Sequence, residues 1–257
     1  MANLKAILFD LDDTLFSTSQ FARSARENSI RAMIAAGLRM SEKELMRELE
    51  EVISEFSSNY QHHFDKLLMR IPRSRYRGVN PAVLIAAAVI GYHETKMRQL
   101  EPYPDAVGLL RLLEGTPLVC GVITDGLQVK QAEKLLRLGI YDLFDPSAIF
   151  ISDQIGISKP NVKLYRRACA SLGFPPSSVM YVGDNPAHDV DPPNSIGILT
   201  VRVHRPGKYA HCEGATSPDY SIKAFEELQA ILETDFGVRL GRTKRTRSTR
   251  KKKSKKG

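Results

Sequence analysis

Short apolar runs recur along this chain, and segments with a helical pattern follow most of them. Runs of this kind are typical of buried strands, and they lie at residues 4–9, 118–124, 148–151, 179–182 and 198–203. Helical patterns follow at residues 128–138, 161–172 and 222–232. Strands and helices that alternate at this spacing predict an α/β fold with a doubly wound parallel sheet.

The segment from residue 16 to residue 100 interrupts this alternation. It contains no convincing strand, and its helical patterns lie at residues 22–36, 41–64 and 81–100. An insert directly after the first strand lies over the carboxyl end of that strand, where open α/β sheets bind their ligands. We therefore predict a helical cap at residues 16–100 and a core formed by residues 1–15 and 101–241.

The positive charge of the chain is concentrated at its end. The net charge is +8, but ten of the 37 lysines and arginines lie in residues 242–256, which contain no acid. The remaining 27 basic residues face 29 acidic ones, so the body of the protein is close to neutral. With no apolar residue to bury, the tail 242–257 is predicted to be disordered. A loose contact with nucleic acid or another polyanion and the absence of a specific partner both remain open.

The cysteines and the hydropathy of the chain predict a cytoplasmic protein. Cys120, Cys169 and Cys212 are odd in number and form no C-x-x-C pair, so neither a disulfide framework nor a zinc site is expected. No apolar stretch of 18 residues and no secretory signal are visible, so no membrane contact is expected. We expect a monomer or a homodimer, in which the apolar residues 81–90 offer a surface to a second subunit.

Two carboxylates lie at the end of the first predicted strand. Asp10 and Asp12 belong to the sequence F-D-L-D-D-T-L, where the chain turns and both can converge on one point. Carboxylates held close together repel each other unless a cation or a proton lies between them. In the same turn, we interpret Asp13 as a turn residue or a partner of a helix dipole, and Thr14 as a residue that orients the loop.

Further polar residues follow the other predicted strands. They are Thr124, Asp125 and Gly126 after the second strand, Lys159 after the third, and Asp184 and Asp189 after the fourth. Because the carboxyl ends of parallel strands lie at one edge of the sheet, these residues can share one pocket with Asp10 and Asp12. Carboxylates, a hydroxyl group and a lysine suit Mg²⁺ together with a phosphate group.

These four groups, in this order, resemble the signature motifs of the haloacid dehalogenase superfamily. The resemblance extends over roughly residues 4–235, and the insert is similar to the type-one helical cap of that superfamily. It implies phosphoryl transfer in two steps through an aspartyl-phosphate on Asp10. Asp12 would serve as general acid and then as general base, and Lys159 would neutralise charge on Asp10 and on the phosphoryl group.

The resemblance also implies ligands for the phosphate and for the metal ion. Thr124 and the backbone amides of Asp125 and Gly126 would hold the phosphate oxygens. Mg²⁺ would be bound by the carboxylates of Asp10 and Asp184 and by the main-chain carbonyl of Asp12. Asp189 would either bind the metal ion as an alternative ligand or contact the residues that bind it.

Asp12 distinguishes among the activities of this superfamily. Cleavage of a carbon–halogen bond needs no proton donor for an alkoxide, and the dehalogenase branch lacks the second aspartate of the first motif. Asp12 therefore favours hydrolysis of a phosphate monoester of a small metabolite. The length, the cap and the opening residues resemble archaeal Mg²⁺-dependent phosphatases, including those that act on glyceraldehyde 3-phosphate. A phosphosugar mutase, or a polyanion-binding protein that works through its tail, is the alternative.

Overall fold

The sheet of this protein is parallel and contains the five predicted strands. The computed structural model describes residues 3–57 and 60–241. The strand order is β3-β2-β1-β4-β5-β6, and every neighbouring pair is parallel. The strands are β1 (Ala6–Phe9), β2 (Val119–Thr124), β3 (Ile149–Ile151), β4 (Val179–Gly183), β5 (Leu199–Val203) and β6 (Tyr220–Ile222). The predicted doubly wound α/β fold is confirmed, with β6 as an additional edge strand.

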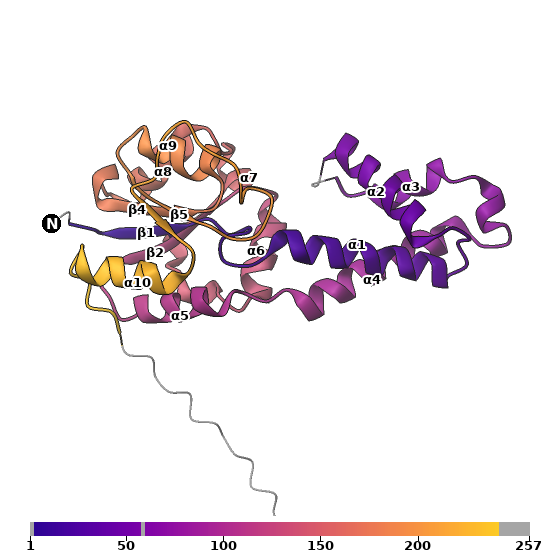
Figure 1. The fold of residues 1–257 in the computed structure, drawn as a ribbon, viewed down its shortest axis with the longest axis horizontal. Coiled ribbons are helices and arrows are strands. Elements are labelled where there is room, and N and C mark those ends of the chain that lie inside the picture. The colour runs from indigo at the N-terminus through magenta and orange to yellow at the C-terminus, as the bar shows by residue number, and fades with distance from the viewer. Residues whose placement is uncertain (1–2, 58–59, 242–257) are drawn as a thin grey trace, which may run out of the picture.

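The helices form two groups, one around the sheet and one beside it (Figure 1). Beside the sheet lie α1 (Thr18–Ala35), α2 (Glu42–Phe56), α3 (His63–Arg70) and α4 (Pro81–Gln99). Around the sheet lie α5 (Pro104–Leu113), α6 (Gln128–Arg137), α7 (Ser152–Ile155), α8 (Val162–Leu172), α9 (Asp191–Asn194) and α10 (Phe225–Thr234).

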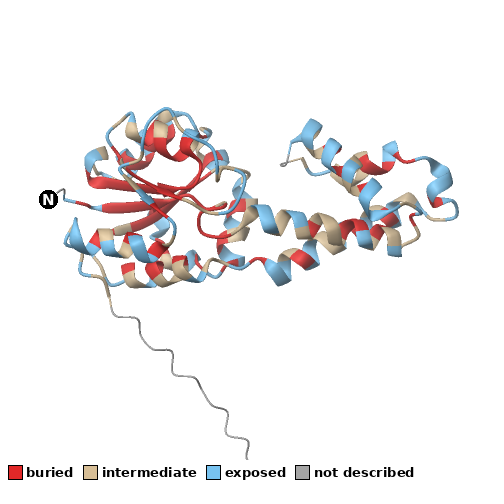
Figure 2. Cartoon of the chain, in the orientation of Figure 1, coloured by how far each residue is buried: buried red, intermediate tan, exposed pale blue. Residues whose placement is uncertain are grey.

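Both faces of the sheet are buried, as its parallel strands require. Side chains alternate along β1, so that Ile7 and Phe9 pack on the face covered by α5 and α10. Ala6 and Leu8 pack on the opposite face, which α8 covers. Figure 2 shows the central strands of the sheet buried between these helices, and every residue of β1 and β4 is buried. An apolar core on both faces fixes the register of the strands, and with it the edge at which their carboxyl ends meet.

The helices beside the sheet have an apolar cluster of their own. Its buried residues all lie between Ile30 and Ala88, and α1 and α4 pack along each other as a long pair (Figure 1). Two adjacent segments connect this pair to the sheet, because Phe16 forms bridges with both Asp12 and Pro102. No helix among the described residues is both long and apolar enough to cross a membrane.

Several elements differ from the prediction, among them the short helices α7 and α9, which were not predicted. The single helix expected at residues 41–64 is wrong, because α2 ends at Phe56, Ser57 takes a positive φ of 66°, and α3 begins only at His63. Helix α5 was not predicted, since Pro104 was interpreted as a boundary although it occupies the first turn of the helix. The helix expected at residues 222–232 begins at Phe225, after β6. The tail 242–257 lies outside the described residues.

Candidate active site

The polar groups predicted to converge follow three adjacent strands. Strand β1 lies between β2 and β4, so Asp10, Thr124 and Asp184 come at neighbouring strand ends. The strand order reverses between β1 and β4, and an open α/β sheet forms its ligand-binding crevice at such a switch point. The sheet therefore brings these three residues together although they are far apart in the sequence.

Lys159 lies at the centre of a buried group of charges. Its Nζ donates to Oδ1 of Asp10 at 2.7 Å and to Oδ1 of Asp189 at 2.8 Å. The Lys159 side chain is 3% exposed and that of Asp189 is 1% exposed. Charges buried to this degree need partners, because desolvation of an unpaired ion costs several kcal/mol. The Asp125 carboxylate accepts a hydrogen bond from the backbone N–H of Lys159 at 3.1 Å and thereby holds the lysine loop.

Three carboxylates in this group can hold a metal ion. Asp10, Asp184 and Asp189 are all buried and each offers an oxygen within 4.8 Å of the others. Burial, together with the neighbouring carboxylates and against the opposing charge of Lys159, raises the pKa of Asp10 from 3.8 to about 7. Burial and the charge of Asp10 raise the pKa of Asp184 to about 8. Three carboxylates face the single positive charge of Lys159 in this group. Carboxylate oxygens with an excess of negative charge suit a divalent cation.

Asp12 does not belong to this triad and binds a second lysine. Lys134 Nζ lies 2.5 Å from Oδ1 and 2.7 Å from Oδ2 of Asp12. The Thr18 hydroxyl donates to Oδ1 at 2.7 Å, and Gln131 Nε2 approaches Oδ2 at 3.4 Å. Sequence reasoning missed Lys134 and Gln131. The signal that could have found them is their position three residues apart on the helix that follows Thr124, which turns both toward the same edge.

The residues predicted to hold a phosphate lie at the end of β2. Thr124 is fully buried, and its Oγ1 has no hydrogen-bond partner among the described residues. Gly126 has a φ of 133°, at which a side chain is strained, and a Cβ atom there would also lie 2.5 Å from Nε2 of the flexible Gln131 side chain. The Gly126 amide donates to Ser152 Oγ at 3.0 Å. The Thr124 hydroxyl, which has no partner among the described residues, is therefore one donor that a phosphate could meet in this conformation.

The remaining residues of the first motif shape the turn between β1 and α1. The Asp13 carboxylate accepts hydrogen bonds from the backbone N–H groups of Thr18 and Ser19 at 2.8 and 3.0 Å, which stabilises the start of the helix. Thr14 Oγ1 lies 3.4 Å from Asp10 Oδ2 and 3.5 Å from Asp184 Oδ1. Asp13 thus acts as the predicted helix partner, while Thr14 lies between two carboxylates of the triad.

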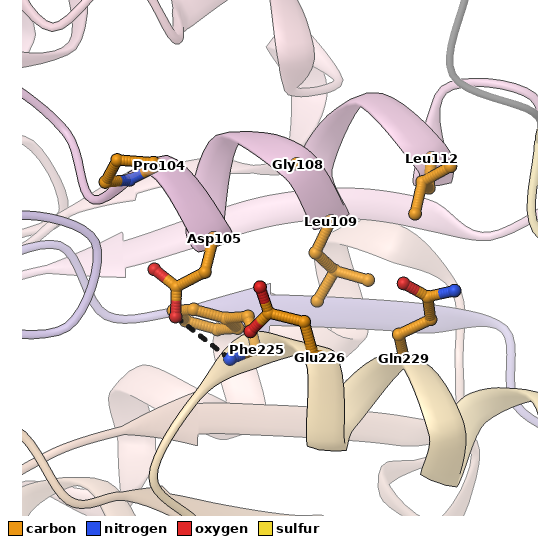
Figure 3. Close-up of a pocket in the computed structure, with 8 residues that line it drawn as sticks. All are labelled: Pro104, Asp105, Gly108, Leu109, Leu112, Phe225, Glu226 and Gln229. Carbon is orange, nitrogen blue, oxygen red and sulfur yellow. Dashed lines mark hydrogen bonds between the residues drawn. The ribbon is translucent and has the colours of Figure 1, made fainter.

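A separate hollow lies between α5 and α10 (Figure 3). Its volume is about 240 Å³, and none of the residues of the four motifs lines it. Asp105, one of its two acidic residues, is fully engaged, since it accepts from the backbone N–H of Phe225 at 3.0 Å and pairs with Arg205 at 2.7 Å. This hollow lies between two helices, away from the carboxyl ends of the strands where the four groups of polar residues lie.

Known proteins share both the sequence and the fold of this chain. A model of haloacid dehalogenase-like hydrolases matches residues 4–197. The glyceraldehyde 3-phosphate phosphatase of Methanopyrus kandleri is 46% identical over 89% of this chain and 97% of its own length, and that of Methanocaldococcus jannaschii is 37% identical over 90% and 97%. A crystal structure of a HAD phosphatase from Thermococcus onnurineus superposes with a TM-score of 0.64 and 25% identity, covering 89% of this chain and 98% of that one. The chain therefore belongs to the haloacid dehalogenase-like hydrolase family.

Proposed function

We propose that this protein is a Mg²⁺-dependent phosphatase that hydrolyses a small phosphate monoester through an aspartyl-phosphate on Asp10. One observation carries the proposal above all others: two carboxylates two residues apart have separate environments. Asp10 is buried with Lys159 and the acidic triad, whereas Asp12 lies outside the triad, paired with Lys134. This separation supports one nucleophile and one proton carrier, which are the two groups that ester hydrolysis needs.

Each residue has a defined task in the first step. An oxygen of Asp10 attacks phosphorus, the bond from phosphorus to the ester oxygen breaks, and its electron pair stays on that oxygen. Asp12 gives its proton to the departing oxygen, so that an alcohol leaves instead of an alkoxide. Lys159 and the Thr124 hydroxyl stabilise the negative charge on the phosphoryl oxygens.

The second step regenerates the enzyme. Asp12, now ionised, takes a proton from a water molecule that attacks phosphorus. The bond between Asp10 and phosphorus breaks, and inorganic phosphate leaves. Asp12 therefore acts as acid and then as base within one turnover, whereas Asp10 acts only as the nucleophile.

The acidic triad supports Mg²⁺ as the cofactor. We propose that Asp10 and Asp184 bind it with the main-chain carbonyl of Asp12, and that Asp189 joins them or holds the ligands in place. When bound, Mg²⁺ offsets the repulsion between the anionic nucleophile and the anionic substrate and polarises the phosphoryl oxygens. The raised pKa values of Asp10 and Asp184 support this assignment, because a cation favours the ionised form of both carboxyl groups.

The relatives suggest a substrate. Proteins named glyceraldehyde 3-phosphate phosphatase match this chain over most of its length, so we propose glyceraldehyde 3-phosphate or a related phosphorylated metabolite. We further propose that helices α1–α4 form the cap, with boundaries near residues 16 and 100, and that the cap selects the substrate. These helices have their own apolar cluster and meet the core at two adjacent segments, as a movable cap requires.

A panel of phosphate esters tests this function. Phosphate release from glyceraldehyde 3-phosphate, glycerol phosphates, nucleoside monophosphates and sugar phosphates is measured with Mg²⁺ and again with EDTA. We expect Mg²⁺-dependent turnover that is greatest for a small ester, and transfer of the phosphoryl group to water. Turnover unaffected by EDTA, or isomerisation of a sugar phosphate without phosphate release, would contradict the proposal.

The basic tail is a separate question. Residues 242–257 carry ten lysines and arginines, and we propose that they contact polyanions weakly without contributing to hydrolysis. Deletion of these residues is expected to leave the kcat unchanged and to abolish salt-sensitive retention on a DNA column. A large loss of kcat would show that the tail belongs to the catalytic unit. The three unpaired cysteines are compatible with the predicted cytoplasmic location.

A further inference from the structure

Helix α6 presents two polar side chains to Asp12 that none of the four motifs contains. Lys134 Nζ contacts both oxygens of the Asp12 carboxylate, at 2.5 and 2.7 Å. Gln131, one turn earlier, donates to the Asp125 backbone carbonyl at 2.5 Å and lies 3.4 Å from Asp12 Oδ2. The helix begins at Gln128, directly after the second motif. The first turns of α6 therefore lie next to the strand ends that carry Asp10 and Thr124.

The Lys134–Asp12 ion pair can fix the orientation of the Asp12 carboxylate, but it contributes little to the stability of the fold. The side chains of Lys134 and Asp12 are 19% and 28% exposed, and pairs in contact with solvent contribute at most about 1 kcal/mol to the free energy of unfolding. The geometry is nevertheless well defined, since one ammonium group contacts both carboxylate oxygens. Lys134 also lies over the ring of Phe16, 5.7 Å from its centre, and Phe16 is almost fully buried.

Asp12 has a strong reason to need such a partner. Its neighbour Asp10 belongs to the triad with Asp184 and Asp189, and a carboxylate free to rotate beside a metal site tends to become another ligand of the cation. A carboxylate bound as a ligand is a poor proton donor for a leaving group on the far side of phosphorus. Contacts from Lys134, Gln131 and Thr18 engage both oxygens of the Asp12 carboxylate and keep it apart from the triad.

We propose that Lys134, supported by Gln131, is a positioning residue that holds the Asp12 carboxylate in line with the leaving-group oxygen and out of the metal site. The inference rests on the proposed phosphatase function and adds a residue to it. Lys134 acts through Asp12 and takes no part in the transfer itself. The proton still passes from Asp12 to the ester oxygen, and from water back to Asp12.

The dependence on the leaving group tests this role. An alkyl phosphate such as glyceraldehyde 3-phosphate needs a proton on its leaving oxygen, whereas p-nitrophenyl phosphate releases a stable anion. We expect Lys134→Met to lower the kcat for glyceraldehyde 3-phosphate by about tenfold, a fraction of what general acid catalysis supplies. The first-turnover release of p-nitrophenol from p-nitrophenyl phosphate, measured by rapid quench, should fall by less than about twofold, because that step needs no proton from Asp12. Lys134→Arg should restore most of the loss, because a guanidinium can also bind both carboxylate oxygens.

Two controls separate positioning from a structural effect. Arg137→Met removes a cation from the same helix, where it pairs with Glu133 at 2.7 Å, and should change neither kcat. Addition of Mg²⁺ should still raise the thermal midpoint of Lys134→Met, because the three carboxylates of the triad remain in place. An equal loss for both esters in the first step, or a lost response to Mg²⁺, would overturn the inference.

A double-mutant cycle provides the decisive comparison. If Lys134 acts through Asp12, Lys134→Met should cause no further loss of kcat in an Asp12→Asn background. Additive losses would show that Lys134 acts elsewhere and would overturn the inference while the phosphatase function stands. A wild-type protein that hydrolyses no ester of the panel would overturn both.

Discussion

Asp10 and Asp12 are two residues apart on the chain, and each pairs with its own lysine. The two ion pairs differ in burial. Asp10 and Lys159 have side chains that are 9% and 3% exposed, within a triad of carboxylates. Asp12 and Lys134 have side chains that are 28% and 19% exposed and lie beside α6. The first pair is shielded from water, so its charges are stabilised mainly by one another. In the second pair, the lysine holds the Asp12 carboxylate in place while that carboxylate stays in contact with solvent.

We propose that this difference lets one motif supply two chemical roles. Burial among charges makes Asp10 dependent on a cation, and its pKa of about 7 without a metal ion is a measure of that dependence. Asp12 remains accessible to water and substrate, as a group that must exchange protons in every turnover requires. The sequence D-x-D alone does not distinguish the two environments. The two lysines, which come from different elements, create the difference.

The largest expected effect is the loss of the nucleophile. Asp10→Asn keeps the shape of the side chain but removes its charge, and we expect the kcat to fall by roughly 10⁴-fold or more, as is typical when a nucleophile is lost. Initial rates of phosphate release with Mg²⁺ measure the effect. Asp142→Asn, at an exposed position, is the matched control and should retain full activity. Comparable activity in the two variants would rule out Asp10 as the nucleophile.

The loss of the proton carrier should depend on the substrate. Asp12→Asn is expected to lower the kcat for glyceraldehyde 3-phosphate by about 10²- to 10³-fold, within the range of general acid–base catalysis. The formation of the aspartyl-phosphate from p-nitrophenyl phosphate should be much less affected, because this leaving group needs no proton. Rapid-quench measurements of p-nitrophenol release separate that step from the later hydrolysis. If both esters lost the same factor in the first step, Asp12 would not be the general acid.

The two lysines should differ in their effect on stability. Lys159→Met leaves buried carboxylates without their counter-charge, and we expect it to lower the free energy of unfolding by about 3 kcal/mol at pH 8. The loss should be smaller at pH 5, because Asp10 takes up a proton there. Lys134→Met should change the free energy of unfolding by less than about 1 kcal/mol at either pH. Urea unfolding of both variants without metal measures the difference, and equal losses would contradict the comparison.

A smaller effect is expected from pH and metal together. Asp10 and Asp184 have pKa values of about 7 and about 8 in the folded protein, against 3.8 ordinarily. The folded state therefore binds more protons than the unfolded chain between about pH 4 and pH 8, and the metal-free protein should lose stability as the pH rises through that window.

Binding of Mg²⁺ should oppose this loss. At a hundredfold excess over its Kd, the metal adds about 2.7 kcal/mol, or roughly 5 °C in the thermal midpoint of a protein of this size. We expect this rise at pH 8 and a smaller one at pH 5, where protons compete for the triad. Asp184→Asn should reduce both the pH dependence and the response to Mg²⁺ in thermal unfolding. An equal response at both pH values would argue against the triad as the metal site.

Much of the fold could be predicted because it follows from local patterns. Buried parallel strands are continuous apolar runs, and five of them were visible in the sequence. The edge strand β6 was missed because Tyr220–Ile222 spans three residues, too few to show a period. Helix α5 was missed because Pro104 looks like an interruption, although proline suits the first turn of a helix.

The candidate site could be predicted only in part, for a different reason. Asp10, Thr124, Lys159 and Asp184 follow strands, so the topology of the sheet predicts their convergence. Lys134 belongs to a polar helix, where a lysine is ordinarily a solvated side chain. Its contact with Asp12 spans 122 positions of the chain and depends on how α6 packs. The spacing of Gln131 and Lys134 places both on one face of the helix, but the contact with Asp12 is a property of the tertiary structure.

The central claim, that Asp10 is phosphorylated while Asp12 moves the proton, can be tested directly by trapping the intermediate. The Asp12→Asn variant is mixed with p-nitrophenyl phosphate and Mg²⁺, quenched in acid, digested and examined by mass spectrometry. Hydrolysis of the intermediate should be slow without the base, so the peptide that contains Asp10 is predicted to carry one phosphoryl group. The Asp10→Asn variant should carry none. Ester hydrolysis with no phosphoryl group on that peptide, or with the group on another residue, would contradict the account.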